Sequence, residues 1–221
     1  MAGVLALVGG GEWRDGCTFD AELLEASGGT EVVVLPTAAA YEAPDKAVAW
    51  ATRWFEGLGA SVRGLDVLER HDALDEAHAD AVRRARFIYL SGGSPLHLRS
   101  VLKESPVWDA LDAAWHDGAV VAGSSAGAMV LCDPMVDPRG GALTVGLGMV
   151  ENLAVVPHAP ASSFEADHRR TLELATEGLV LLGIEEQTAA LRDPDGTWRT
   201  AGAGATTVWA GGAVVGMDAL P

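Results

Sequence analysis

The chain has 221 residues, of which 49% are hydrophobic, enough for one well-packed α/β domain without obvious room for a second. Its formal net charge of −16 disfavours binding to nucleic acid and to anionic membranes, so we expect neither as a partner. No stretch approaches the ~20 uninterrupted apolar residues of a membrane span, and residues 1–11 lack the basic region of a signal peptide. Two cysteines without metal-ligand spacing indicate a reduced, cytoplasmic protein with no structural zinc.

Apolar runs bounded by glycine or proline alternate with amphipathic stretches in the first part of the chain. The runs predict strands at residues 4–8, 31–35, 61–68, 86–90 and 119–122. The amphipathic stretches predict helices at residues 45–58, 72–84, 94–101 and 106–116. Asp72 is the expected N-cap of the second helix, and Ser94 followed by Pro95 is a typical start for the third. Such alternation favours a doubly wound, mostly parallel sheet with helices on both faces.

The character of the sequence changes after residue 131. Residues 133–148 are rich in glycine and proline and predict a loop or hairpin, followed by a strand at 153–157 and a helix at 163–178. The remainder predicts strands at 179–184, 188–192, 197–200, 206–209 and 213–215. The turn at 193–196 joins two of these strands as a hairpin. We therefore expect one α/β domain over residues 1–221, with a C-terminal antiparallel strand extension.

The most informative segment is Gly-Ser-Ser-Ala-Gly at residues 123–127, which lies between a short apolar strand and a run of helix formers. A strand, a tight turn with a central serine and a helix are the context in which G-x-S-x-G holds a nucleophile. The turn would place Ser125 at the positive end of the helix dipole, with the N–H of Ala126 free to stabilise an oxyanion. The alternative is a connection rich in small residues that only allows close packing.

A serine nucleophile needs a base, and His158 is the histidine whose position fits best. It follows the predicted strand 153–157, and catalytic groups gather at the carboxyl ends of strands in parallel α/β sheets. An ordinary structural histidine at a strand end is the alternative. The other five lie on predicted helices or in polar stretches: His71, His78, His97, His116 and His168.

The acid that would orient this histidine has three candidates. Glu186 follows the apolar strand that ends at residue 184, again at a carboxyl end. Glu185 and Asp133 are its rivals, and Asp133 is nearer to Ser125 in sequence but lies in the loop-rich segment. We favour Glu186, with Asp133 as the alternative acid.

Two glycine turns follow predicted strands and expose backbone N–H groups. Gly92 and Gly93 close the strand 86–90 and could supply a second oxyanion donor. The turn at residues 9–11 lacks the G-x-G-x-x-G spacing of a dinucleotide site. We interpret its glycines as residues that allow tight packing of the turn.

Taken together, these segments resemble the dipeptidase E and cyanophycinase family of serine peptidases. The resemblance rests on residues 5–12, 32–38, 90–93, 123–128, 157–158 and 183–189, which match the family's motifs in family order along most of the chain. It implies a class I glutamine amidotransferase-like fold with Ser125 as nucleophile and His158 as base. Cyanophycinase-like members place their acid at the position of Glu186, whereas dipeptidase E-like members place it nearer Asp133.

The resemblance and the residues together imply a hydrolase of small peptides, with aspartyl dipeptides among the candidate substrates. Acyl transfer by a serine triad requires no metal or organic cofactor. A chain of this net charge would repel an acidic substrate, so a local cation must compensate, and Arg169 and Arg170 are the candidates, with Arg99 behind them. Ser94, which stands where the family has a different polar residue, is a further candidate for substrate contact.

Three other functions compete with this one. An α/β-hydrolase esterase would place its acid before its histidine, unlike the order Ser125, His158, Glu186; with Asp133 as the acid, the order no longer separates the two functions. A glutamine amidotransferase would carry cysteine at the position of Ser125. A non-catalytic binding or regulatory domain of the same fold is the main alternative, and an open cleft beside Ser125 would favour the enzyme. No coiled-coil seam indicates a particular oligomeric state.

Overall fold

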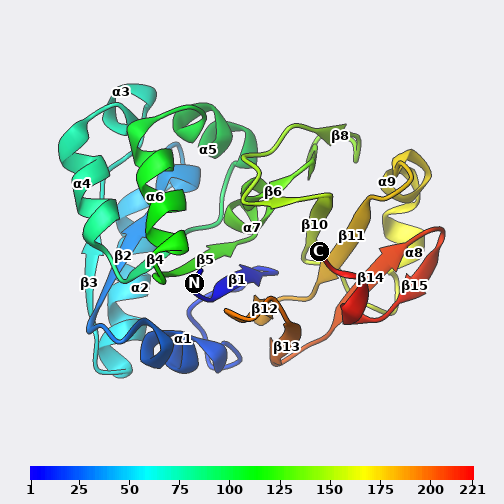
Figure 1. The fold of residues 1–221 in the computed structure, drawn as a ribbon, viewed down its shortest axis with the longest axis horizontal. Coiled ribbons are helices and arrows are strands. Elements are labelled where there is room, and N and C mark those ends of the chain that lie inside the picture. The colour runs from blue at the N-terminus through cyan, green and yellow to red at the C-terminus, as the bar shows by residue number, and fades with distance from the viewer.

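The computed structural model describes residues 1–221 and is built around a seven-stranded sheet of order β13-β12-β1-β5-β4-β2-β3 (Figure 1). Its strands are β1 (Leu5–Val8), β2 (Glu31–Leu35), β3 (Ser61–Gly64), β4 (Phe87–Leu90), β5 (Val120–Ser124), β12 (Thr188–Arg192) and β13 (Trp198–Gly202). The first five run parallel, whereas β12 is antiparallel to β1 and β13 is antiparallel to β12. This arrangement confirms the predicted α/β class and the antiparallel C-terminal extension.

Helices cover both faces of this sheet because its strands are apolar on both sides. In β1, Ala6 and Val8 pack into the core under α1 (Phe19–Ser27) and α2 (Pro44–Gly57), while Leu5 and Leu7 pack into the opposite core. That opposite core is covered by α3 (Arg70–Ala73), α4 (Glu76–Arg84), α5 (Pro95–Leu102), α6 (Pro106–His116) and α7 (Ala126–Leu131). A short 3-10 helix, η1 (Thr37–Ala39), precedes α2. None of the helices combines the length and apolar character that crossing a membrane requires.

A second sheet lies beside the first, at the right of Figure 1. Its order is β10-β11-β14-β15, with bounds Leu153–Pro157, Val180–Ile184, Thr206–Ala210 and Ala213–Val215. Strands β10 and β11 are parallel, so their carboxyl ends, which precede His158 and Glu185, lie side by side. The remaining elements are β6 (Cys132–Asp133), β7 (Met135–Val136), β8 (Leu143–Thr144), β9 (Val150–Glu151), α8 (Phe164–Asp167), α9 (Arg169–Leu174) and η2 (Met217–Ala219).

The predicted helix at 72–84 is wrong at its start. The chain forms α3, breaks, and begins α4 after Asp75, whose carboxylate accepts a hydrogen bond of 2.8 Å from the N–H of Ala77. Asp72 is not the N-cap because its carboxylate instead accepts bonds from the N–H groups of Leu68 and Glu69. Other differences are the unpredicted α1, the end of β3 at residue 64, and the division of the predicted helix 163–178 into α8 and α9.

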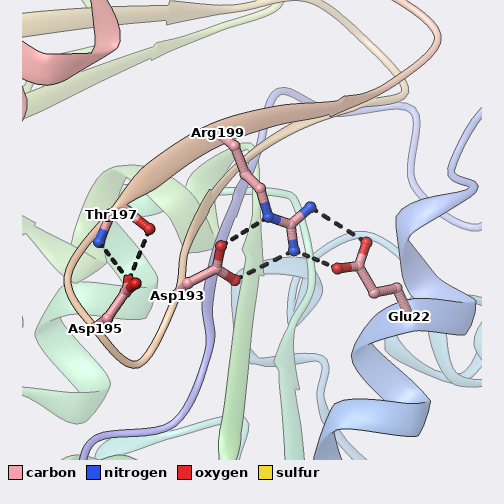
Figure 2. Close-up of polar contacts among 5 residues, drawn as sticks. All are labelled: Glu22, Asp193, Asp195, Thr197 and Arg199. Carbon is pink, nitrogen blue, oxygen red and sulfur yellow. Dashed lines mark hydrogen bonds and ion pairs between the residues drawn. The ribbon is translucent and has the colours of Figure 1, made fainter.

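The hairpin of β12 and β13 is fastened to α1 by one arginine (Figure 2). The guanidinium of Arg199 bonds to Asp193 in the turn, with Nε 2.8 Å from Oδ2, and to Glu22 on α1. Within the turn, Asp195 accepts bonds from the N–H and hydroxyl of Thr197. The hydrogen bond to Asp193 raises the pKa of Arg199 above its usual value. These contacts fasten the β12–β13 hairpin, at the edge of the seven-stranded sheet, to helix α1.

A buried carboxyl group connects α1 to α2. Asp20 is fully buried, and its Oδ2 accepts a hydrogen bond of 2.9 Å from the indole N–H of Trp54. Its other oxygen, Oδ1, has no partner. Burial raises the pKa of Asp20 to about 8, because the charged carboxylate would lose its hydration without a compensating cation.

This pKa predicts how stability depends on pH. Between about pH 4 and pH 8 the folded protein holds a proton on Asp20 that the unfolded chain releases, so rising pH destabilises the fold. Asn at this position does not titrate. We therefore expect the free energy of unfolding of Asp20→Asn, relative to wild type, to increase as pH rises through this range. Urea titrations at several pH values measure the difference, and a constant difference would contradict the buried acid.

Candidate active site

Ser125 sits at a sharp turn between β5 and α7. Its backbone adopts φ 48° and ψ −105°, a conformation that costs a non-glycine residue about 1–3 kcal/mol. The main-chain N–H of Ser125 donates to the carbonyl of Val8, 2.9 Å away, which ties the turn to β1. Glycine is required at both flanking positions, because a Cβ on Gly123 would lie 2.6 Å from the carbonyl carbon of Gly127, and a Cβ on Gly127 would lie 2.6 Å from the carbonyl oxygen of Leu90. The serine hydroxyl does not cap α7, so it is available to face the neighbouring β10.

The structure brings Ser125, His158 and Glu186 into one hydrogen-bonded chain. Ser125 Oγ lies 2.9 Å from His158 Nε2, and His158 Nδ1 lies 3.0 Å from Glu186 Oε1. The three residues follow three different strands, β5, β10 and β11, whose carboxyl ends converge. The side chains of His158 and Glu186 are 48% and 54% exposed, so the group is open to solvent and to a ligand.

The glycine turn at residues 9–11 holds this group together, which sequence analysis interpreted only as tight packing. The carbonyl of Gly9 accepts a 2.8 Å bond from the N–H of His158, and that of Gly10 accepts a 2.7 Å bond from Gln187. A Cβ on Gly10 would lie 2.1 Å from Cε1 of the His158 ring. The turn therefore positions the histidine and the segment that carries Glu186.

The three expected oxyanion donors differ in their surroundings. Ala126 is the first residue of α7, where the N–H has no intrahelical partner, and the N–H of Gly93 donates no hydrogen bond in the structure. The N–H of Gly92 is already engaged by Glu12, whose Oε1 is 3.1 Å away. The other oxygen of Glu12 accepts a 2.8 Å bond from the hydroxyl of Ser124. Glu12 thus links the Gly92 loop to the turn, a role that sequence analysis missed.

The rival acids are occupied elsewhere. Asp133 Oδ1 accepts a 2.7 Å bond from the N–H of Gly146. The two oxygens of Glu185 accept bonds from the N–H groups of Ala161 and Ala205. Neither carboxylate contacts a histidine, whereas Glu186 does.

The other histidines take structural or surface positions. His97, His78 and His116 each place a ring nitrogen 2.8–2.9 Å from a backbone carbonyl. His71 is exposed beside acidic neighbours on α3. Partial burial lowers the pKa of His168. No group of three or more His, Cys, Asp and Glu side chains is arranged to hold a metal ion.

Comparison with known proteins assigns the chain to a family. The sequence profile described as Peptidase family S51 matches residues 5–197. The chain belongs to peptidase family S51. This is a family of serine peptidases, and the assignment confirms the resemblance to the dipeptidase E and cyanophycinase group that the sequence motifs indicated.

The relatives of this S51 peptidase include cyanophycinases and peptidases of known structure. It is 28% identical to cyanophycinase from Synechococcus elongatus, over 93% of this chain and 67% of that protein. The structure of a peptidase from an acI-B1 Actinobacterium matches with a TM-score of 0.82 and 29% identity over 97% of both chains. A Listeria monocytogenes EGD-e protein provisionally named peptidase E shares the fold, with a TM-score of 0.70 and 20% identity over 92% of this chain and all of that one.

Two cavities meet at Ser125 and His158 of the S51 peptidase. A cavity of about 770 Å³ extends towards α2, and one of about 380 Å³ extends towards α9. Arg170 lines the smaller cavity.

The other expected substrate contacts lie elsewhere. Arg169 lines a separate hollow with Glu165 and Trp209. Ser94 caps α5, since its hydroxyl accepts a bond of 3.3 Å from the N–H of His97. Arg99 lines neither cavity, and its Nε is buried without a partner.

The close approach of Gly10 to His158 can be tested by substitution. We expect Gly10→Ala to displace the imidazole and break its bond to Ser125, because the new Cβ would overlap Cε1. Gly28→Ala is the matched control, since Gly28 also has a positive φ but a Cβ there would contact nothing within 4 Å. Crystal structures of both variants measure the distance from Ser125 to His158. An unmoved ring in Gly10→Ala would contradict this account of the turn.

Proposed function

We propose that this S51 peptidase hydrolyses small peptides through Ser125, His158 and Glu186. The observation that carries the proposal is the continuous chain of two hydrogen bonds, 2.9 and 3.0 Å long, from the serine hydroxyl through the imidazole to the carboxylate. Sequence order and spacing favour the same three residues. The strained backbone of Ser125 supports the assignment, since such strain is concentrated at functional sites.

The geometry suits acyl transfer. His158 Nε2 accepts the proton of Ser125 as Oγ attacks the scissile carbonyl, and Glu186 orients the imidazole and stabilises its positive charge. The proton then passes to the leaving amine, and an acyl-enzyme forms on Oγ. Water, deprotonated by the same histidine, attacks the acyl-enzyme and releases the second product. This scheme requires no metal or organic cofactor.

The oxyanion of the tetrahedral intermediate would lie against Gly93 and Ala126. Their N–H groups are the two expected donors that are not engaged by other residues near the turn. Each such donor contributes about 3 kcal/mol to stabilising the transition state. Glu12 acts as a positioning residue, because its carboxylate accepts bonds from the N–H of Gly92 and the hydroxyl of Ser124, the neighbours of Gly93 and Ser125 in sequence.

Acidic peptides are the substrates that we propose for the smaller cavity, with aspartyl dipeptides among them. Arg170 is the cation that lines this cavity beside Ser125. Of its two acidic neighbours, Asp137 is paired with Arg139 at 2.6 Å, and Asp167 accepts a bond from the hydroxyl of Ser163. The guanidinium of Arg170 is therefore available to a substrate carboxylate.

The alternative, a non-catalytic binding domain, predicts an incomplete or closed site. The connected triad and the two cavities that open onto Ser125 favour the enzyme instead.

Hydrolysis of a defined dipeptide library, including α- and β-aspartyl members, tests the proposed function by mass spectrometry. We expect wild type to cleave a subset, and Ser125→Ala to lower the rate by at least about 10³-fold, because the nucleophile is lost. Ser100→Ala is the matched control, because its exposed hydroxyl bonds only to a carbonyl within α5. Cleavage that survives in Ser125→Ala would reject the nucleophile, and a wild-type protein that cleaves nothing would favour the binding domain.

A further inference from the structure

One face of helix α2 lines the larger cavity, although the amphipathic sequence of this helix indicates no functional role. Lys46, Trp50, Arg53, Trp54 and Gly57 all line the cavity. Their spacing of four, three, one and three residues places them on one side of a helix. This face continues the cavity from the triad along the helix.

The cavity is longer than a dipeptide requires. From Lys46 to Gly57 the helix rises by roughly 16 Å, at 1.5 Å per residue. An extended dipeptide spans only about 7 Å. The cavity, of about 770 Å³, begins at Ser125 and includes Gly57 at the far end of α2. A peptide of four or more residues therefore fits along it with its scissile bond at Ser125.

The arm of the cavity beyond the triad is rich in positive charge. Lys46 and Arg53 on α2 face the same space as Arg14, which follows the glycine turn. None of these three cations forms an ion pair in the structure.

The acidic groups that line the same cavity offset only part of this positive charge. Glu12 and Glu186 are engaged at the triad end, which leaves Glu42 as the one carboxylate in the arm. On a chain with a net charge of −16, such a local concentration of cations selects for an anionic ligand.

Two tryptophans give the same arm an apolar surface. Trp50 is 61% exposed, which is unusual for a residue of this size. Trp54 is held by its bond to Asp20 and is fixed before a ligand arrives. A Cβ on Gly57 would contact nothing within 4 Å, so the far end of the groove is open. This combination suits a peptide whose backbone and apolar side chains pack against the indole rings and whose carboxylate pairs with one of the cations.

We propose that the α2 face, defined as Lys46, Trp50, Arg53 and Trp54 together with Arg14, is an extended subsite for acidic peptides. It binds a carboxylate side chain several residues away from the scissile bond, in addition to the residue next to Ser125. This inference rests on the proposed peptidase function for the identity of its ligand. It is separate from the Arg170 cavity, which lies on the other side of the triad.

Binding to the Ser125→Ala variant tests the subsite without relying on catalysis. The probes are pairs of hexapeptide pools. Five positions are randomised in each pool, and the remaining position is fixed as Glu in one pool of the pair and as Gln in the other. Successive pairs place the fixed residue at each position along the peptide. Calorimetry or tryptophan fluorescence measures the dissociation constants. We expect Glu at a distal position to bind about fivefold more tightly than Gln, with a preference that fades at high salt.

The subsite variant is Lys46→Gln/Arg53→Gln in the same Ser125→Ala background. We expect it to reduce the preference for Glu to less than about twofold, because both proposed partners of the carboxylate are neutral. The control, Arg84→Gln/Lys103→Gln, removes the same charge on the opposite face of the sheet, beside α4 and α5, and should keep the preference.

The outcomes separate this inference from the proposed function. A distal Glu preference that depends on Lys46 and Arg53 supports the subsite, even if the wild type cleaves no dipeptide. Equal binding of Glu and Gln pools, or equal loss in both double variants, would overturn it, even if Ser125 proves to be the nucleophile. The wild type could instead form a dimer that Lys46→Gln/Arg53→Gln dissociates without altering peptide binding. That result would assign the α2 face to a second copy of the chain and would also overturn the inference.

Discussion

The geometry of the candidate active site depends on two backbone hydrogen bonds, which the carbonyls of Gly9 and Gly10 accept from the N–H groups of His158 and Gln187. They join the turn after β1, in the main sheet, to the segments that follow β10 and β11 in the second sheet. Ser125 follows a strand of the main sheet, whereas His158 and Glu186 follow strands of the second, so these bonds help to fix the distances among the three side chains. Catalysis by a triad tolerates little error in such distances, since a misplacement of about 1 Å can cost a hundredfold in rate.

Backbone strain is concentrated at the same place. Of the six non-glycine residues with positive φ, three are Ser125, His158 and Gln187. Such conformations persist only when the surroundings determine them, and here β1 and β5 are buried on both faces by two apolar cores. The doubly wound sheet thus supplies the stability that lets the turn at Ser125 and the segment after β10 keep unfavourable backbone angles. Loops without this support would relax and move the serine away from the imidazole.

Much of the fold could be predicted from the sequence because its signals are local. The apolar run before residue 123 and the small residues after it indicate a strand, a turn and a helix whatever the rest of the chain does, and the structure places Ser125 at that turn. The sequence wrongly predicts Asp72 as a cap, because no local pattern shows the break after α3 or the bonds that the Asp72 carboxylate accepts from residues 68 and 69. The catalytic roles of the site residues stay predictions.

Other features of the site depend on tertiary contacts that no local pattern shows. Glu12 bonds across 112 residues to Ser124 and across 80 to Gly92, so its role is visible only when β1, β4 and β5 are side by side. The sequence of α2 indicates only an ordinary amphipathic helix. That Lys46 and Arg53 line a cavity with Arg14 is seen only in the folded structure. For the same reason Arg169 and Arg170, adjacent in sequence, line different hollows, and only one of them lies near Ser125.

The most direct test of the account is the rate at which a fluorophosphonate labels the protein, with the modified residue located by mass spectrometry. A serine activated by His158 and Glu186 should be labelled at Ser125, and Glu186→Gln should slow labelling by at least about a hundredfold. Asp133→Asn, which removes the same charge from a carboxylate that bonds to Gly146, should label at nearly the wild-type rate. Labelling at another residue, or a greater loss in Asp133→Asn than in Glu186→Gln, would contradict the proposed triad.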